Sequence, residues 1–166
     1  MMDHLWTPWR MPYLKGDTST SGPGCIFCHK VSTQDDTAEH IIHRGTYCYI
    51  TMNLYPYNNG HLLIVPNQHT GALEALDGAA ALELVELTQK SLVMLRRTFS
   101  PQGFNIGINQ GAAAGAGVAA HLHQHIVPRW SGDTNYMTVV AATRVIPEWV
   151  DDTYRTLKQV WDELYP

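Results

Sequence analysis

The sequence lacks the features that mark membrane-spanning, secreted or nucleic-acid-binding proteins. It has no run of about 18 apolar residues, so no membrane span is expected. Its amino terminus has no charged region followed by an apolar core, as a secretory signal would. Charged residues make up only 16% of the chain and the net charge is -4, which argues against a basic surface for nucleic acid. We therefore predict a cytoplasmic protein, with no membrane or nucleic acid as partner and with its three cysteines reduced or metal-bound.

Three histidines at alternate positions are the most informative feature of the chain. They lie in the run HLHQHIVPRW, residues 121–130, as His121, His123 and His125. Side chains alternate between the two faces of an extended strand, so this spacing predicts a strand with all three imidazoles on one face. A single histidine on a strand more often belongs to a core or a solvated face. Three in register favour a chemical role over that structural one.

The segment before the histidines is GAAAGAG at 111–117. Its side chains are too small to pack a hydrophobic core, and it contains too much glycine to form a stable helix. Such a loop can present backbone N–H groups to an anion. A loop of this kind followed by histidines favours phosphate chemistry on an imidazole. A neutral imidazole attacks activated phosphorus to give a nucleotidyl-histidine, which a second acceptor then cleaves. His123 is the natural attacking group because it has a histidine on either side.

Cys25 and Cys28 are two residues apart, which lets both thiolates reach one metal ion. A redox role would need a thioredoxin-like βαβ pattern, which we do not find, while reduced core cysteines remain an alternative. A metal site needs two more ligands. The candidates are the histidines and the cysteine elsewhere in the chain: His29, His40, His43, Cys48, His61, His69 and the three alternate histidines.

The remaining patterns predict an α+β fold, in which an antiparallel sheet of about five strands carries one long helix and a C-terminal helix. Short β-type runs occupy 41–44, 47–52, 61–65 and 104–109, in addition to the histidine strand, and 136–142 is a further extended candidate. The length of 166 residues suits a single domain, 1–166, made of an aromatic-rich N-terminal arm (1–23) and a catalytic core (24–166).

Asp77 is the expected N-cap of the long helix at about 78–99. We predict that one face of this helix is buried and contains the apolar residues Leu82, Val85, Leu92 and Leu95. The opposite face should be solvated and contains the charged residues Glu83, Glu86, Lys90 and Arg97. The last helix should begin around Pro147 and run to about Leu164, burying a stripe of apolar side chains: Val150, Tyr154, Leu157, Trp161 and Leu164.

The run HLHQHIV at 121–127 resembles the triad motif of the histidine-triad (HIT) superfamily of nucleotide hydrolases and transferases. The continuation PRWSGDTNYM at 128–137 and the run LWTPWRM at 5–11 resemble its bacterial diadenosine tetraphosphate phosphorylase, or ATP adenylyltransferase, branch. The resemblance covers nearly the whole chain. It implies a HIT-like fold, a homodimer, and nucleotidyl transfer through His123, with diadenosine tetraphosphate as donor and inorganic phosphate as acceptor, giving ADP and ATP.

The resemblance also implies roles for the other histidines and the cysteines. His125 would bond the phosphate oxygens and support proton transfer. His61 would orient the triad from behind, although a buried strand histidine bonded to backbone is the alternative. Family members that bear zinc imply a structural, tetrahedral site that ties the amino-terminal cysteines to the catalytic strand, with the ligands Cys25, Cys28, His69 and His121.

Substrate contacts follow from the resemblance in the same way. Asn53 and Leu54 match positions that meet the ribose and the base, and Asn109 with the backbone of Gly115, Ala116 and Gly117 matches the α-phosphate cradle. Relatives often carry a polar side chain near Gly117, and its absence here leaves the cradle to the backbone. Arg129 could pair with a distal or acceptor phosphate, or instead with Asp133 or Trp130.

Two other functions stay open at this point. The first is a HIT-family hydrolase of nucleoside phosphoramidates or adenylate esters that uses water as acceptor and gives AMP. The second is a zinc-stabilised nucleotide-binding protein without catalysis.

Overall fold

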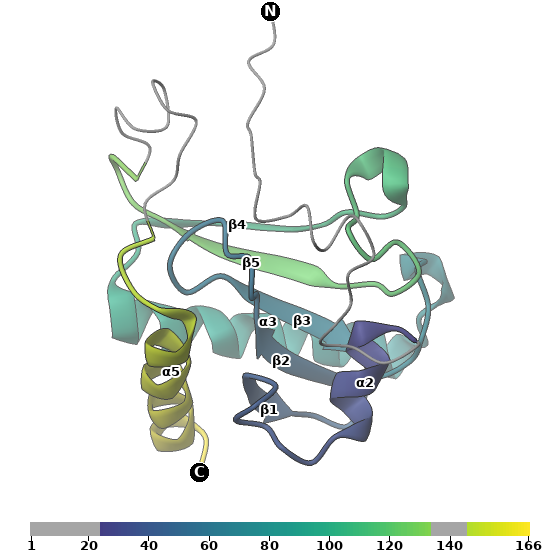
Figure 1. The fold of residues 1–166 in the computed structure, drawn as a ribbon, viewed down its shortest axis with the longest axis horizontal. Helices are drawn as coiled ribbons and strands as arrows, with labels where there is room; N and C mark the ends of the chain where they lie inside the picture. The colour runs from purple at the N-terminus through teal and green to yellow at the C-terminus, as the bar shows by residue number, and fades with distance from the viewer. Residues whose placement is uncertain (1–23, 134–145) are drawn as a thin grey trace, which may run out of the picture.

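Five antiparallel strands form a sheet in the order β1-β2-β3-β5-β4 (Figure 1). The structure is a computed structural model and describes residues 24–133 and 146–166. The predicted arm at 1–23 and the extended candidate at 136–142 lie outside these residues. The strands are β1 (Ile41–Arg44), β2 (Cys48–Met52), β3 (Leu62–Pro66), β4 (Gly103–Ile108) and β5 (Gln124–Arg129).

Helices cover both faces of the sheet, which confirms the predicted α+β class (Figure 1). Helices α3 (Gly78–Phe99) and α5 (Val150–Leu164) pack on one face, and the short helix α2 (Ile26–Ser32) lies on the other. Two 3-10 turns, η2 (Leu73–Ala75) and η3 (Ala112–Ala114), complete the elements of the described residues. Among those residues, no helix combines the length and the apolar character needed to cross a membrane.

The two central strands are buried on both faces because each face has its own core. Every residue of β2 and β3 is buried. Ile50 and Ile64 face the larger core with α3 and α5, whereas Tyr49 and Val65 face the smaller core with Phe27 of α2. Strands covered on both sides read as continuous apolar runs, which is why β3 shows little alternation in the sequence.

Helix α3 has the predicted bounds and the predicted cap, since the Asp77 carboxylate accepts a hydrogen bond from the Ala79 N–H at 2.8 Å. The predicted buried face is wrong for Leu82 and Val85, which are 60% and 52% exposed. The face that packs on the sheet lies about half a turn away and contains Ala80, Leu84, Leu87, Ser91, Met94 and Leu95. Apolar residues occur on both sides of this helix, so periodicity alone did not select the buried side.

Glu83 was predicted to be solvated, and the structure shows a different role. Its carboxylate accepts hydrogen bonds from the N–H groups of Thr46, Tyr47 and Cys48 at 2.9, 2.5 and 2.7 Å. These bonds join the turn between β1 and β2 to α3. At Gly45 an added Cβ would lie 2.7 Å from the Glu83 carboxylate, so the turn approaches the helix more closely than a side chain allows.

The C-terminal helix ends at Leu164 as predicted but begins at Val150, three residues after Pro147. Tyr154, Leu157 and Trp161 are buried against the core of α3. Because α5 also packs near β1, it closes the side of the sheet that lies away from β4.

Candidate functional site

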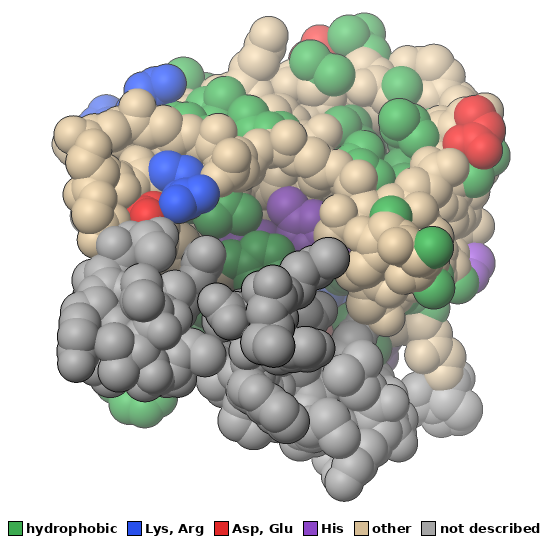
Figure 2. Space-filling model, turned by 90° about the horizontal axis from the view of Figure 1, so that it is seen from above, with side chains coloured by type: hydrophobic (Ala, Val, Ile, Leu, Met, Phe, Trp, Pro, Cys, Tyr) green, Lys and Arg blue, Asp and Glu red, His purple; other side chains and the backbone are tan. Residues whose placement is uncertain are grey.

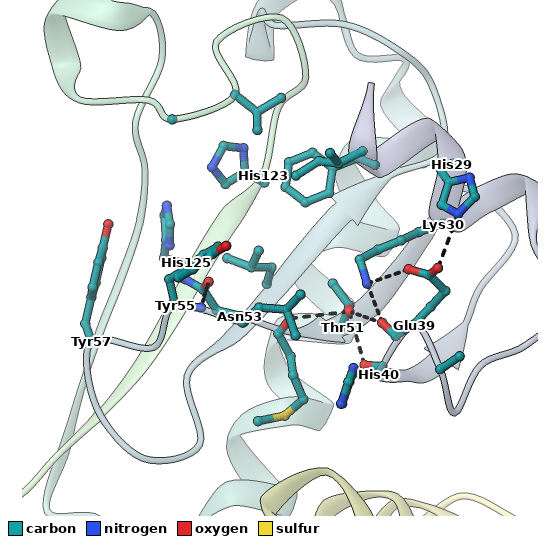
Figure 3. A pocket seen from close by; sticks show the side chains of 18 of the residues that line it. His29, Lys30, Glu39, His40, Thr51, Asn53, Tyr55, Tyr57, His123 and His125 are labelled. Atoms are coloured by element: carbon teal, nitrogen blue, oxygen red, sulfur yellow. Dashed lines mark hydrogen bonds and ion pairs between the residues drawn. The ribbon is translucent and has the colours of Figure 1, made fainter. Parts of the chain in front are cut away.

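A pocket of about 500 Å³ opens on the face of the sheet that carries α2. Its wall comes from α2, the end of β2 with the following loop, the glycine loop, and the residues leading into β5. Figure 2 shows histidine side chains at the base of a hollow in this face. Figure 3 shows His123 and His125 at one end of the pocket, with Asn53 between them and a polar group at the other end. Both histidines line the pocket.

His123 is 6% exposed, and its ring Nδ1 lies 2.9 Å from the carbonyl oxygen of His121. A carbonyl oxygen only accepts, so Nδ1 carries the proton and Nε2 keeps its lone pair. Burial lowers the pKa of His123, which favours the neutral ring near neutral pH. The result is a neutral imidazole with an unprotonated Nε2 in the wall of a pocket, the state that a nitrogen nucleophile needs.

His125 belongs to a hydrogen-bond chain that sets its tautomer. The Tyr57 N–H donates to His61 Nδ1 at 3.0 Å, so His61 holds its proton on Nε2. His61 Nε2 lies 3.0 Å from His125 Nδ1, which therefore accepts and leaves the proton of His125 on Nε2. Burial, followed by the neighbouring charges of His125 and His123, lowers the pKa of His61 to about 3 and keeps the His61 ring neutral. His125 thus becomes a hydrogen-bond donor through Nε2.

The three alternate histidines do not share one environment. The strand begins at Gln124, and the ring of His121 joins Cys25, Cys28 and His69, while His123 and His125 line the pocket. Gln124 points to the other face of the sheet, where its amide donates to the Thr88 hydroxyl of α3 at 2.6 Å.

The glycine loop places Gly115 and Gly117 in the pocket wall beside His123. Gly111 and Gly115 have φ values of 81° and 86°, in the region that favours glycine. The Gly115 and Ala116 N–H groups donate within the loop, to the Ala112 and Gly111 carbonyls. The Gly117 N–H has no acceptor among the residues that the structure describes. Of the expected backbone cradle, Gly117 is therefore the member whose N–H is available to an anion.

The other expected substrate residues are divided between the pocket and its surroundings. Asn53 and Leu54 line the pocket, and the Asn53 amide lies 3.3 Å from His61 Nδ1. Asn109 and Ala116 are not among the lining residues. Arg129 also lies outside the wall, and its guanidinium donates to both carboxylate oxygens of Asp133, at 2.6 and 2.9 Å. The structure thus places Arg129 in the ion pair that the sequence had left as an alternative to phosphate binding.

Cys25, Cys28, His69 and His121 come together, with their ligand atoms all within 4.8 Å of one another. Cys25 Sγ and His69 Nδ1 lie 3.2 and 3.3 Å from His121 Nδ1, and Cys28 Sγ lies 3.2 Å from His69 Nδ1. A tetrahedral ion about 2.3 Å from sulfur and about 2.0 Å from nitrogen holds its ligands roughly 3.3–3.8 Å apart. His121 Nε2 donates to the Pro66 carbonyl at 2.8 Å, which leaves Nδ1 as the ligand atom. This group can bind a metal ion.

The remaining metal candidates from the sequence lie elsewhere. His29, His40, His43, Cys48 and His61 are not in this group. Several pocket residues were missed as site residues or assigned another candidate role, among them Lys30, Glu39, His40 and Tyr57. Tyr57 stacks on His125 with ring centroids 5.8 Å apart. In the sequence, Tyr57 follows a Tyr-Pro pair in the turn before His61. That local pattern indicated a turn but did not indicate that the Tyr57 ring would contact His125.

The fold and the pocket define a class: an α+β protein with two histidines in a pocket beside a group of two cysteines and two histidines that can bind metal. The family profile described as the HIT domain matches residues 34–132, and the chain belongs to the HIT family.

Known proteins resemble the chain along most of its length. It is 39% identical over 165 residues to the AP-4-A phosphorylase of Mycobacterium tuberculosis, covering 96% of this chain and 85% of that protein. A Zn-bound histidine triad family protein from Mycobacterium smegmatis superposes with a TM-score of 0.69 at 27% identity, over 85% of this chain and 95% of the other. A diadenosine triphosphate hydrolase of Plasmodium falciparum, at 21% identity and a TM-score of 0.64 over 77% of this chain and 80% of the other, shows the same fold.

Proposed function

We propose that this protein is a nucleotidyl-transferring enzyme that splits diadenosine tetraphosphate with inorganic phosphate into ADP and ATP. The observation that carries the proposal is the tautomer of His123, whose Nδ1 bonds the His121 carbonyl and whose Nε2 is left as a nucleophile at the pocket wall. The similarity to a protein named AP-4-A phosphorylase over 96% of the chain supports the choice of substrate.

The reaction takes two displacements at one phosphorus atom. His123 Nε2 attacks the α-phosphorus, the bond from that phosphorus to the bridging oxygen breaks, and ATP leaves while AMP stays bonded to the ring. An oxygen of inorganic phosphate then attacks the same phosphorus, the P–N bond breaks, and ADP forms. The His125 Nε2–H and the Gly117 N–H are the donors placed to bond the non-bridging phosphate oxygens, where charge accumulates in each transition state.

Asn53 lies in the middle of the pocket, where the ribose of a bound nucleotide would lie (Figure 3), and Leu54 lines the same pocket. His61 acts through His125, because its Nε2–H holds the His125 ring by a bond of 3.0 Å. Asn109, Ala116 and Arg129 remain proposed contacts for the longer polyphosphate, outside the wall of the pocket. Arg129 would have to exchange part of its pair with Asp133 to make such a contact.

Zinc is the metal that we propose for the group of Cys25, Cys28, His69 and His121. Two thiolates and two imidazoles form a closed tetrahedral set, so the ion would stabilise the fold and leave no position for substrate. It would join α2 to the residue two before His123. Cysteines that serve as thiolate ligands also fit the cytoplasm, a reducing compartment that we propose as the location.

A homodimer is part of the same proposal. Leu82, Val85 and Val93 of α3 and Ile106 of the edge strand β4 are each 46–60% exposed. A second copy of the chain would cover apolar side chains of this kind. Sedimentation equilibrium on the full chain should give twice the monomer mass, and a Leu82→Glu, Ile106→Glu variant should give the monomer mass. A parent that sediments as a monomer would exclude the dimer.

The acceptor is tested by product analysis. Enzyme is incubated with diadenosine tetraphosphate with and without inorganic phosphate, and nucleotides are separated by chromatography. We expect ADP and ATP only when phosphate is present. AMP formed at the same rate without phosphate would instead identify a hydrolase, and absence of any turnover would favour a binding protein. His123→Ala should bind AMP without turnover, whereas Cys48→Ala, which changes a buried cysteine outside the pocket, should remain active.

A further inference from the structure

The end of the pocket farthest from His123 is polar, although the wall between is largely apolar (Figure 3). Phe27, Leu63 and Val118 belong to the apolar part. At the polar end lie Lys30 of α2 and the two residues before β1, Glu39 and His40 (Figure 3). A nucleotide with its phosphate at His123 would direct its base along the apolar wall toward Lys30 and Glu39.

Lys30 and Glu39 form a well-shielded ion pair in this wall. Lys30 Nζ lies 3.0 Å from Glu39 Oε2, and the two side chains are only 9% and 22% exposed. A buried ion pair seldom stabilises a protein more than apolar residues of the same size, so stability does not account for the pair. Lys30 also donates to the Glu39 carbonyl oxygen. An ammonium group has three N–H bonds, so one remains for a ligand.

His40 lies beside the pair and holds its ring against α5. Its Nε2 lies 2.6 Å from the Asp151 carboxylate of α5, and its ring centroid lies 5.4 Å from that of Tyr154. Its Nδ1 is buried and has no hydrogen-bond partner among the residues that the structure describes, so a ligand in the open pocket does not reach it. His40 also has a φ of 54°, unusual for a residue other than glycine, so its backbone is held in a strained conformation.

We propose that Lys30 and Glu39 form the subsite that reads the edge of the nucleobase, and that they select an exocyclic amino group next to a ring nitrogen. This inference rests on the proposed nucleotide function. Glu39 supplies an acceptor for an N–H bond of the amino group, and Lys30 supplies a donor for the ring nitrogen. Adenine has this edge. A 6-oxo purine places a carbonyl oxygen where the amino group would be and leaves an acceptor of the subsite unpaired.

The test compares the binding of two nucleotides that differ at this edge, AMP and inosine monophosphate, by titration calorimetry on the full-length protein. The parent should bind AMP at least about tenfold more tightly, as expected for a paired contact to a base edge. The double variant Lys30→Met, Glu39→Leu leaves no lone buried charge, and its preference should fall to within about twofold. The variant Arg97→Met, Glu163→Leu removes an exposed ion pair between α3 and α5 and should keep the parent's preference.

A second variant covers the case in which the double variant does not fold. Glu39→Gln retains the shape of the side chain but replaces one acceptor with an amide donor, so the preference should shift toward inosine monophosphate. Equal affinities in the parent, or an unchanged preference in folded Glu39→Gln, would overturn the inference. If the parent prefers AMP but does not turn over diadenosine tetraphosphate, the proposed reaction fails and the base subsite stands. Turnover with equal affinities would reject the subsite alone.

Discussion

His123 Nδ1 lies 2.9 Å from the backbone carbonyl of His121. His121 is therefore both a member of the cysteine and histidine group and the hydrogen-bond partner of the proposed nucleophile. The same residue has its ring among Cys25, Cys28 and His69 and its carbonyl on His123. A change in the position of His121 would therefore alter both the aim and the tautomer of His123. Such a link lets a structural metal group affect catalysis without touching substrate.

The pH dependence of turnover should report the burial of His123. Burial lowers its pKa, so the active neutral ring persists below the ordinary value of 6.5 and is lost only at more acidic pH. Phe27 contributes to this burial, with its ring centroid 5.0 Å from that of His123. Phe27→Ala should admit water and move the acid limb of kcat/KM up toward 6.5.

The matched control for that experiment is Phe104→Ala, which removes a phenyl ring packed against the other core. Its acid limb should coincide with that of the parent. Kinetics with diadenosine tetraphosphate between about pH 5 and 8 cover the range in which a histidine titrates. A parent limb above 6.5 would contradict a neutral nucleophile that is shielded from water.

His61 should make the folded protein sensitive to acid. Its pKa is lowered to about 3, so the unfolded chain binds a proton between about pH 6.5 and 3 that the folded chain does not. The contribution of His61 is therefore complete above about pH 6.5 and is lost as the pH falls through this range. In urea unfolding, the difference in free energy of unfolding between the parent and His61→Gln should shrink as the pH is lowered. Parallel stability curves for the two proteins would show that His61 does not titrate in this way.

Removal of one proposed metal ligand should lower both metal content and stability. The protein purified without added metal is expected to contain one zinc per chain by mass spectrometry of the metal. Cys28→Ser should lose most of it and unfold about 10 °C lower, because the energy of binding a structural metal adds to folding. Cys48→Ala, which removes a thiol outside the group, should keep the zinc. A parent with no bound zinc and a melting temperature unaffected by chelator would reject the site.

Glu83 should matter for stability although its charge predicted a solvated side chain. Its carboxylate accepts three backbone N–H groups from the turn between β1 and β2. Glu83→Gln should cost about 2 kcal/mol, because hydrogen bonds to a charged group are stronger than neutral ones and the amide accepts through one oxygen only. Urea unfolding measures this loss, with the exposed Glu86→Gln as control. Equal free energies of unfolding for the two variants would remove the role assigned to Glu83.

Patterns that repeat within a few residues were readable directly from the sequence. The cap at Asp77 and the pair of Cys25 and Cys28 each involve neighbours along the chain, where spacing is set by the geometry of a helix or a short turn. The alternation of His121, His123 and His125 indicated a strand, but β5 begins at Gln124, so only His125 lies in it. The five strands and the two longer helices follow from such local periodicities, and the structure confirms them. The resemblance to a family added the distant partner His69.

Packing of remote segments accounts for what those patterns did not reveal. Leu82 and Leu84 are equally apolar, yet only Leu84 is buried, because the position of the sheet selects one side of α3. Lys30 meets Glu39 in the pocket wall for a similar reason, since the turn of α2 and the approach to β1 bring them together. Contacts of this kind depend on the free energy of the whole fold, in which one arrangement of faces buries the most apolar surface, and no short stretch of residues encodes that choice.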